Sequence, residues 1–138
     1  MDVHEPEVRS YNMSRIKSRD TKPELIVRKF LFNKGFRYRV NDKRLPGKPD
    51  IVLPKYKTVI FIHGCFWHGH KNCKYAPTPK TRTDWWQAKI DTNKKRDIVN
   101  YRLLRSLGWK IIKIFECELK TKNREKVLNK LIKSILQL

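Results

Sequence analysis

The amino-acid sequence predicts an α/β domain in which helices flank a mixed central sheet. Two observations predict this fold class: segments with helical periodicity alternate with short runs of β-branched and aromatic residues, and glycines and prolines separate the segments. A chain of 138 residues is also long enough to bury one core. We therefore expect a single domain over residues 1–138, with residues 1–20 as an N-terminal arm and residues 21–138 as the core.

The first helix is expected to begin with Thr21 as its N-cap. Pro23 would stand in its first turn, and Glu24 has the third position of a capping box, where its carboxylate can accept a free backbone N–H. Gly35 can end the helix, and a short strand is expected over residues 36–40. The apolar face of this helix comprises Ile26, Val27, Phe30 and Leu31.

Two further strands are expected to form a hairpin. Residues 50–53 and 58–63 are rich in β-branched and aromatic residues, and residues 54–57 predict the turn between them. The segment from His63 to Cys73 predicts a metal-binding loop, and residues 74–83 predict a connecting loop.

The C-terminal half predicts a helix, a strand and a helix. The long helix is expected to begin at Thr83 or Asp84 and to run to about Leu107, where Gly108 stops it. Residues 109–115 predict a strand, and residues 123–137 predict the last helix. The expected buried positions are Ile98, Tyr101, Leu104 and Leu107 in the long helix and Leu128, Leu131 and Ile135 in the last one.

The chain is strongly basic. It has 33 Lys and Arg against 13 Asp and Glu, which gives a net charge of +20. So much like charge opposes folding, and solubility alone needs far less of it. A polyanionic partner is therefore expected, and the charge by itself fits RNA, ribosomal RNA included, as well as DNA.

Several features favour a cytoplasmic protein. No apolar run is long enough to span a bilayer, and the first residues lack the basic-then-apolar order of a signal peptide. Three cysteines are an odd number, which does not fit a closed disulfide framework and fits a reducing compartment where thiols bind metals.

Histidines and cysteines gather between His63 and Cys73. Cys65, His70 and Cys73 have the spacing of one side of a zinc site, and Cys117 is available as a distant fourth ligand. Three thiolates and one imidazole would close the shell, so this zinc would be structural and would leave no position for substrate. His68 is the alternative imidazole ligand, and ordinary buried thiols are the alternative for Cys65 and Cys117.

A second group of residues predicts catalysis. Folding about the turn at 54–57 places Asp50 opposite residues 61–63, close to the carbonyl of Ile62 and the imidazole of His63. A carboxylate and a carbonyl are oxygen ligands suited to Mg²⁺, which can help to break a phosphodiester. His63 or His68 would then move a proton. For Glu24, the capping box is the first interpretation and a metal role the second.

Aromatic residues lie among polar and basic neighbours in two places. Phe66 and Trp67 fall inside the expected metal-binding loop, and Trp85 and Trp86 open the long helix. Stacking on or between bases is the functional interpretation, and packing within the loop is the alternative. For Trp85 a place in the core is the alternative to stacking.

Four stretches of the chain match one family. They are residues 9–21, the Leu-Pro-Gly-Lys-Pro-Asp of residues 45–50, residues 59–68 with the string His-Gly-Cys-Phe-Trp-His, and residues 81–83. Residues 107–109 and 116–117 fit as well. On these residues the chain resembles the Vsr mismatch endonucleases of bacterial very-short-patch repair, over about residues 8–120.

The resemblance implies a fold like that of type II restriction endonucleases (the PD-(D/E)XK type) and an activity. Such an enzyme nicks one strand of double-stranded DNA 5′ of the T in a T:G mismatch left by deamination of 5-methylcytosine. The resemblance also implies Mg²⁺ bound by Asp50 and the Ile62 carbonyl, catalysis assisted by His63 and His68, and a structural Zn²⁺ held by the residues Cys65, His70, Cys73 and Cys117.

The resemblance further implies how DNA is read. Phe66, Trp67 and Trp86 would wedge into the duplex beside the mismatch, with Met13 as a wedge in the minor groove. Lys89 and Asn93 would read the mismatched pair. The arm of residues 1–20 would contact DNA, and the enzyme would act as a monomer at the bacterial nucleoid, with mismatch-repair proteins as further partners.

The chain departs from the better-known members at two places, and two other functions compete. Ile62 replaces a Thr, which leaves a backbone carbonyl ligand intact, and the stretch after Trp67 has fewer histidines and one more residue. The competing functions are a zinc-containing, non-catalytic nucleic-acid-binding protein and a restriction-type nuclease that cuts matched duplex.

Overall fold

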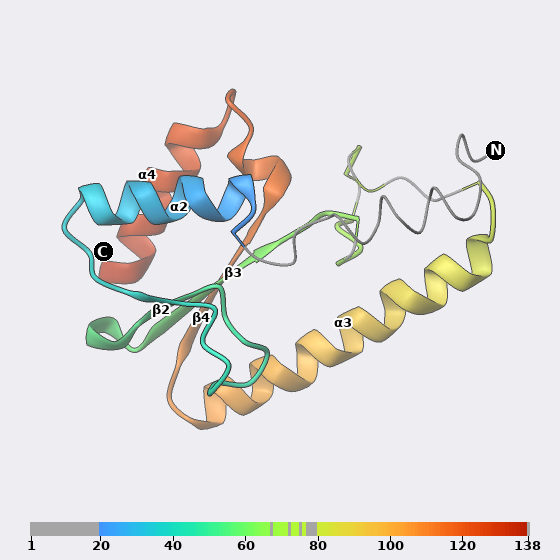
Figure 1. Cartoon of the computed structure of the whole chain (residues 1–138), viewed down its shortest axis with the longest axis horizontal. Helices are drawn as coiled ribbons and strands as arrows, with labels where there is room; N and C mark the ends of the chain where they lie inside the picture. The colour runs from blue at the N-terminus through green and yellow to red at the C-terminus, as the bar shows by residue number, and fades with distance from the viewer. Residues whose placement is uncertain (1–19, 67, 72, 75, 77–79, 138) are drawn as a thin grey trace.

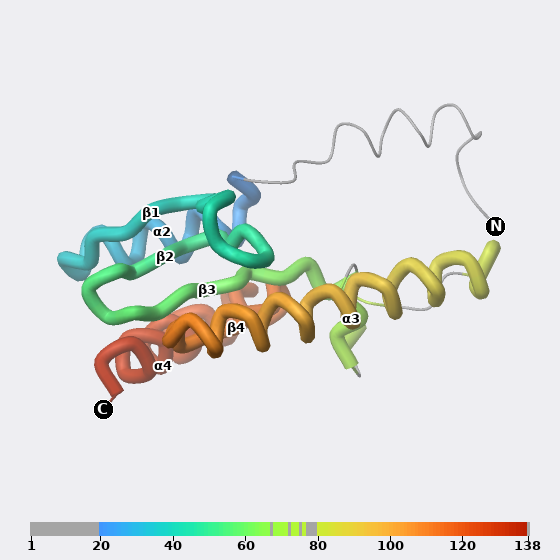
Figure 2. Tube along the Cα trace, turned by 90° about the horizontal axis from the view of Figure 1, so that it is seen from below, coloured from blue at the N-terminus to red at the C-terminus, as the bar shows by residue number. Residues whose placement is uncertain are grey.

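A four-stranded sheet with helices on both faces forms the part of the chain that the computed structural model describes, which is residues 20–66, 68–71, 73–74, 76 and 80–137. The helices α2 (Lys22–Asn33) and α4 (Arg124–Leu136) lie together on one face, and α3 (Thr83–Ser106) runs along the other face and beyond the sheet (Figure 1, Figure 2). Among these residues, no helix has both the length and the apolar composition needed to cross a membrane.

The sheet is mixed, as expected. Its order is β1 (Arg39–Val40), β2 (Ile51–Leu53), β3 (Thr58–His63) and β4 (Lys110–Phe115). The first two pairings are antiparallel, and β3 pairs with β4 in parallel, with α3 as the crossover. The expected turn between β2 and β3 is the short 3₁₀ helix η1 (Pro54–Tyr56), followed by Lys57 in a left-handed conformation.

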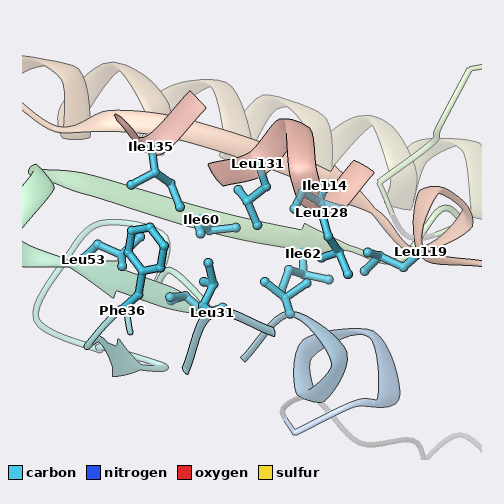
Figure 3. Close-up of a cluster of buried hydrophobic side chains, with 12 residues drawn as sticks. Leu31, Phe36, Leu53, Ile60, Ile62, Ile114, Leu119, Leu128, Leu131 and Ile135 are labelled. Carbon is cyan, nitrogen blue, oxygen red and sulfur yellow. The ribbon is translucent and has the colours of Figure 1, made fainter. Parts of the chain in front are cut away.

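Both faces of β3 are buried. Side chains alternate along a strand, so successive residues of β3 pack on opposite faces of the sheet. Ile60 and Ile62 point into a core that also contains α2 and α4 (Figure 3). Val59 and Phe61 point the other way and pack with Tyr101 and Leu104 of α3. His63 continues this second series, so the strand geometry directs its imidazole toward α3.

Glycines end two helices where the sequence predicts it. Gly35 has φ +89°, and Phe36 N–H donates to Leu31 C=O at 3.0 Å. Gly108 also has φ +89°, and Trp109 N–H donates to Leu104 C=O at 3.0 Å. Both glycines thus satisfy carbonyls at a helix end through the left-handed conformation that a Cβ would disfavour. In α4, the expected Leu128, Leu131 and Ile135 are buried.

Four local expectations are wrong. Ile98 and Leu107 are about half exposed. Each step of three residues turns a helix by about 300°, so residues spaced by three drift around the helix, and only Tyr101 and Leu104 of this series face the sheet. The strand expected over residues 36–40 is only Arg39–Val40, and Phe36 packs in the core instead. Arg82, not Thr83 or Asp84, precedes α3 as its N-cap.

Candidate functional site

Asp50 lies immediately before β2, at the end of the sheet where β3 finishes. Its carboxylate accepts the backbone N–H of Ile62 at 2.6 Å, and its own carbonyl accepts Asn41 N–H at 3.1 Å. The register of the hairpin, with Ile51 opposite Ile60, produces this approach. The expected meeting of Asp50 with residues 61–63 is therefore present.

Glu24 supplies a second carboxylate near Asp50, and this one is buried. Thr21 forms no side-chain cap, and Glu24 accepts the N–H of Asp20, one residue before the N-cap, at 2.9 Å. The reciprocal capping box expected from the sequence is therefore not formed. Arg28 binds both Glu24, at 3.0 Å, and Asp20, at 2.7 Å, which compensates the buried negative charge in part.

The environment of Asp50 makes its ionised form costly. The pKa of this carboxyl is raised to about 6, chiefly by burial and to a smaller extent by the charge of the neighbouring Glu24. The hydrogen bond from Ile62 and the charges of Arg28 and His68 oppose this rise. A half-buried carboxylate with a raised pKa beside a second carboxylate is a place where a cation would be stabilised.

Two histidines stack beside these carboxylates. The rings of His63, at the end of β3, and His68 lie 3.8 Å apart between centroids with an interplanar angle of 26°. His68 Nδ1 bonds to Asp97 of α3 at 2.7 Å, and His63 Nε2 bonds to the hydroxyl of Tyr101. Burial and the neighbouring His68 lower the pKa of His63, so this imidazole stays neutral near pH 7.

The stack is better suited to proton transfer than to holding a metal, although ring nitrogens and a carboxylate oxygen of His63, His68 and Asp97 lie within 4.8 Å of one another. A nitrogen lone pair lies in the plane of its ring, so two nearly parallel rings direct their lone pairs side by side rather than at one ion. One nitrogen of each ring is also engaged already, by Tyr101 and by Asp97.

The parallel register of β3 and β4 brings Cys65 and Cys117 together. His63 pairs with Phe115, so the residues two positions farther along each strand leave the sheet side by side. The loop then folds back, with His70 N–H donating to Cys65 C=O at 2.8 Å and the His70 ring stacked on Phe115 at 3.9 Å. Cys117 Sγ lies 3.3 Å from His70 Nδ1.

These contacts assemble a cluster that can hold a metal ion. One ligand atom from each of Cys65, His70, Cys73 and Cys117 lies within 4.8 Å of the others. Neighbouring sulfur atoms in a tetrahedral zinc shell are about 3.8 Å apart, so the donor set and its spacing fit such an ion. Burial raises the pKa of the Cys65 thiol to about 12 and also raises that of Cys117, which a bound cation would reverse.

The aromatic residues expected to contact DNA lie around the start of α3. Phe66 packs edge-on against Trp86, with centroids 5.3 Å apart, and Trp86 packs against Trp85 at 4.7 Å. Trp86 is buried, whereas Trp85 is about half exposed, so the core position considered for Trp85 is wrong. Trp67 and Met13 lie outside the described residues.

Lys89 and Asn93 stand one turn apart on α3, on the C-terminal side of Trp86. Lys89 is exposed and Asn93 is half-buried. Two residues closer to the sheet were missed by the sequence reasoning as parts of the site: Asp97, which was not singled out, and Tyr101, which was expected only in the core. Their spacing of four residues on one helix was the available signal, because it lets both reach the same neighbours.

Comparisons with known proteins identify the family of the chain. The family described as DNA mismatch endonuclease Vsr matches residues 1–74. The chain is 55% identical over 136 residues to the type II nicking enzyme V.NmeAIP of Neisseria meningitidis serogroup A, covering 97% of this chain and 96% of the relative. It is 41% identical over 136 residues to the DNA mismatch endonuclease Vsr of Escherichia coli, covering 99% of this chain and 85% of the relative.

A third relative is the type II nicking enzyme V.XorIIP of Xanthomonas oryzae pv. oryzae, at 45% identity over 114 residues that cover 83% of each chain. The first two of these matches cover nearly the whole chain, well beyond the matched segment 1–74. The resemblance read from the sequence is thus confirmed, and the chain belongs to the Vsr family of DNA mismatch endonucleases.

Proposed function

We propose that the protein is a Mg²⁺-dependent DNA endonuclease that nicks one strand 5′ of the T in T:G mismatches, as in very-short-patch repair. The observation that carries this proposal is the half-buried carboxylate of Asp50, bound to Ile62 N–H and flanked by Glu24 and the His63–His68 stack. Membership in a mismatch endonuclease family supports the substrate.

Asp50 and the carbonyl of Ile62 are the proposed ligands of Mg²⁺. In an extended strand, the N–H and C=O of one residue point to the same side. Because Ile62 donates its N–H to Asp50, its carbonyl is directed to the same side of β3, beyond the start of β2. Two hard oxygens in this position leave most of the coordination shell to water and phosphate, which Mg²⁺ prefers. Glu24 takes part through the charge that it adds beside Asp50.

Bound Mg²⁺ would neutralise charge on the scissile phosphate and lower the pKa of an attacking water. His68 is the proposed proton carrier, because it is the more accessible of the two stacked histidines and its Nδ1 is held by Asp97, which leaves Nε2 for the substrate. His63, which is buried and neutral, would orient His68. Its Nε2 is bonded to Tyr101, so it would contact the reacting phosphate through Nδ1.

Zn²⁺ is proposed for the second cluster, with Cys65, His70, Cys73 and Cys117 as its four ligands. A shell closed by four protein ligands stabilises the loop between β3 and α3 and takes no part in hydrolysis. His70 is favoured over His68 because it contacts Cys117, whereas His68 binds Asp97. The loop so fixed carries Phe66 and His68, which links the zinc to both DNA contact and catalysis.

Mismatch selectivity is proposed to come from wedging. Phe66 and Trp86 stand next to each other, and with Trp67 they would enter the duplex from one side while Met13 enters the minor groove. Because Trp86 is buried against Phe66 and Trp85, its ring would have to be uncovered on binding. Lys89 and Asn93 would then test the base edges of the wobble pair.

The wider proposals concern the fold and the partners. The mixed sheet between helices is compatible with a restriction-endonuclease-like fold, and the arm of residues 1–20 is proposed to contact DNA. The enzyme is proposed to act as a monomer on double-stranded DNA, together with mismatch-repair proteins. The large net charge of +20 supports a phosphate backbone as partner.

One assay tests the function and its two competitors. Purified protein is incubated with two end-labelled duplexes that differ only in one T:G or T:A pair, embedded in randomised flanking bases, with and without added Mg²⁺. A single nick 5′ of the T, in the T:G duplex and only with Mg²⁺, is expected. Equal cleavage of both duplexes would instead indicate a restriction-type nuclease, and binding without any nick would indicate a non-catalytic protein.

A further inference from the structure

Tyr101 of α3 holds His63 through a hydrogen bond inside the core. The Tyr101 hydroxyl and His63 Nε2 are bonded inside the protein, where both side chains are buried. The contact joins the end of β3 to the C-terminal part of α3. It therefore links the strand that bears one stacked histidine to the helix that bears Asp97, the partner of the other.

The packing around Tyr101 leaves its ring little freedom. Its edge meets Phe61, with centroids 5.3 Å apart, and Lys113 of β4 lies over the ring at 5.1 Å. Tyr101 also belongs to the core between α3 and the sheet, with Val52, Val59 and Leu104. Since the ring is fixed by this packing, the hydroxyl can impose an orientation on the imidazole rather than follow it.

The direction of the hydrogen bond follows from the chemistry of the pair. Burial raises the pKa of Tyr101, and the negative charges of Asp97 and Asp50 raise it further, so the phenol keeps its proton. A protonated phenol can donate to a bare Nε2 or accept from an Nε2–H, so both tautomers of His63 allow this contact. Donation by the phenol is the stronger arrangement, because an imidazole nitrogen is a better acceptor than a phenol oxygen, and it leaves the ring proton of His63 on Nδ1.

We propose that Tyr101 is a positioning residue that fixes His63 as its Nδ1-protonated tautomer and holds the ring in the stack with His68. This inference rests on the proposed nuclease function, in which His63 contacts the reacting phosphate. Asp97 and Tyr101 are one helical turn apart on α3, and each binds one ring of the stack. One face of α3 thus aligns both histidines, and Nδ1–H of His63 is the donor that remains for substrate.

The test uses Tyr101→Phe, which keeps the ring and its packing and removes only the hydroxyl. The matched control is Tyr56→Phe, which removes a hydroxyl beside Phe36 in the core on the opposite face of the sheet. For each full-length protein, single-turnover nicking of the T:G duplex, the Kd for that duplex, the melting temperature and the imidazole ¹⁵N shifts of His63 are measured.

Tyr101→Phe is expected to lower the nicking rate about 5- to 10-fold, the effect of one hydrogen bond between neutral groups, with Kd unchanged. The ¹⁵N shifts of the wild type are expected to show a protonated Nδ1 and a bare Nε2, and those of Tyr101→Phe a mixture of tautomers. Tyr56→Phe should match the wild type in rate, Kd and shifts.

Two results would overturn the inference: a wild-type His63 protonated on Nε2, or a Tyr101→Phe variant with wild-type rate and unaltered tautomer. The ¹⁵N measurement needs no DNA cleavage. If the wild type fails to nick any duplex, the proposed function is wrong, while the tautomer still decides whether Tyr101 positions His63.

Discussion

The backbone N–H of Ile62 donates to the carboxylate of Asp50 at 2.6 Å, and this contact connects the fold to its chemistry. It exists because β2 and β3 are paired with Ile51 opposite Ile60, so the residue before β2 must lie beside the end of β3. The same contact ties a carboxylate whose pKa is raised to the strand that leads into the histidine stack.

The raised pKa of Asp50 predicts a pH-dependent cost in stability. Its folded pKa of about 6 exceeds the value near 3.9 of an unfolded chain, so the folded state loses stability as the pH rises toward 6 and carries the full cost above it. At pH 8 without added Mg²⁺, the free energy of unfolding of Asp50→Asn, measured by urea titration, should therefore exceed that of the wild type by about 2–3 kcal/mol. This difference in stability should be smaller at pH 5.

Asp42 is the matched control for this prediction, because its pKa is shifted in the opposite direction. Hydrogen bonds from Arg44 hold the pKa of Asp42 at about 2, below its unfolded value, so its stabilising contribution is complete at every pH above about 4. Asp42→Asn should be less stable than the wild type by the same amount at pH 5 and pH 8. A gap for Asp50→Asn that is equally independent of pH would contradict the assignment.

The cysteine cluster predicts one zinc ion per chain and separate roles for two histidines, His70 in zinc binding and His68 in catalysis. His70→Ala removes a proposed ligand and should lower both the zinc content and the melting temperature, because metal binding is coupled to folding. His68→Ala, two residues away, should retain zinc and stability and lose nicking. Elemental analysis and thermal unfolding of the two variants provide the measurement. If His68→Ala lost zinc and His70→Ala kept it, His68 and not His70 would be the zinc ligand.

The pair of Phe66 and Trp86 predicts selectivity for mismatches. Unstacking a base step costs a few kcal/mol, and less where pairing is already poor, so a wedge favours a T:G step before any base is read. Phe66→Ala should reduce nicking of the T:G duplex far more than binding to a matched duplex. Phe32→Ala removes an exposed aromatic ring from α2 and should change neither. Equal losses on both duplexes would show that Phe66 only packs in the loop.

The order of helices and strands was predictable because each element carries its own local signal. Gly35 and Gly108 end their helices, and the hairpin turn sets the place of Asp50. The gathering of histidines and cysteines also marked the loop after β3. These features depend on neighbours in the sequence, or on one register that the turn determines.

The parts that sequence reasoning missed depend on contacts between distant elements. Asp97 reaches His68, and Tyr101 reaches His63, only because α3 crosses over the end of β3. A spacing of three residues made Ile98 and Leu107 candidates for the core, but the position of the sheet selects a narrower face of the helix. The pairing of Glu24 with Arg28 and Asp20 N–H likewise follows from how the chain enters α2.

The central claim is that Asp50 holds the catalytic Mg²⁺. The most direct measurement is the single-turnover nicking rate of the T:G duplex by Asp50→Asn as Mg²⁺ is increased, with Asp42→Asn as the control and with binding to the duplex measured in parallel. We predict that Asp50→Asn binds the duplex and produces no nick at any Mg²⁺ concentration, while Asp42→Asn nicks at the wild-type rate. Nicking by Asp50→Asn at the wild-type rate, with the same dependence on Mg²⁺, would contradict the account.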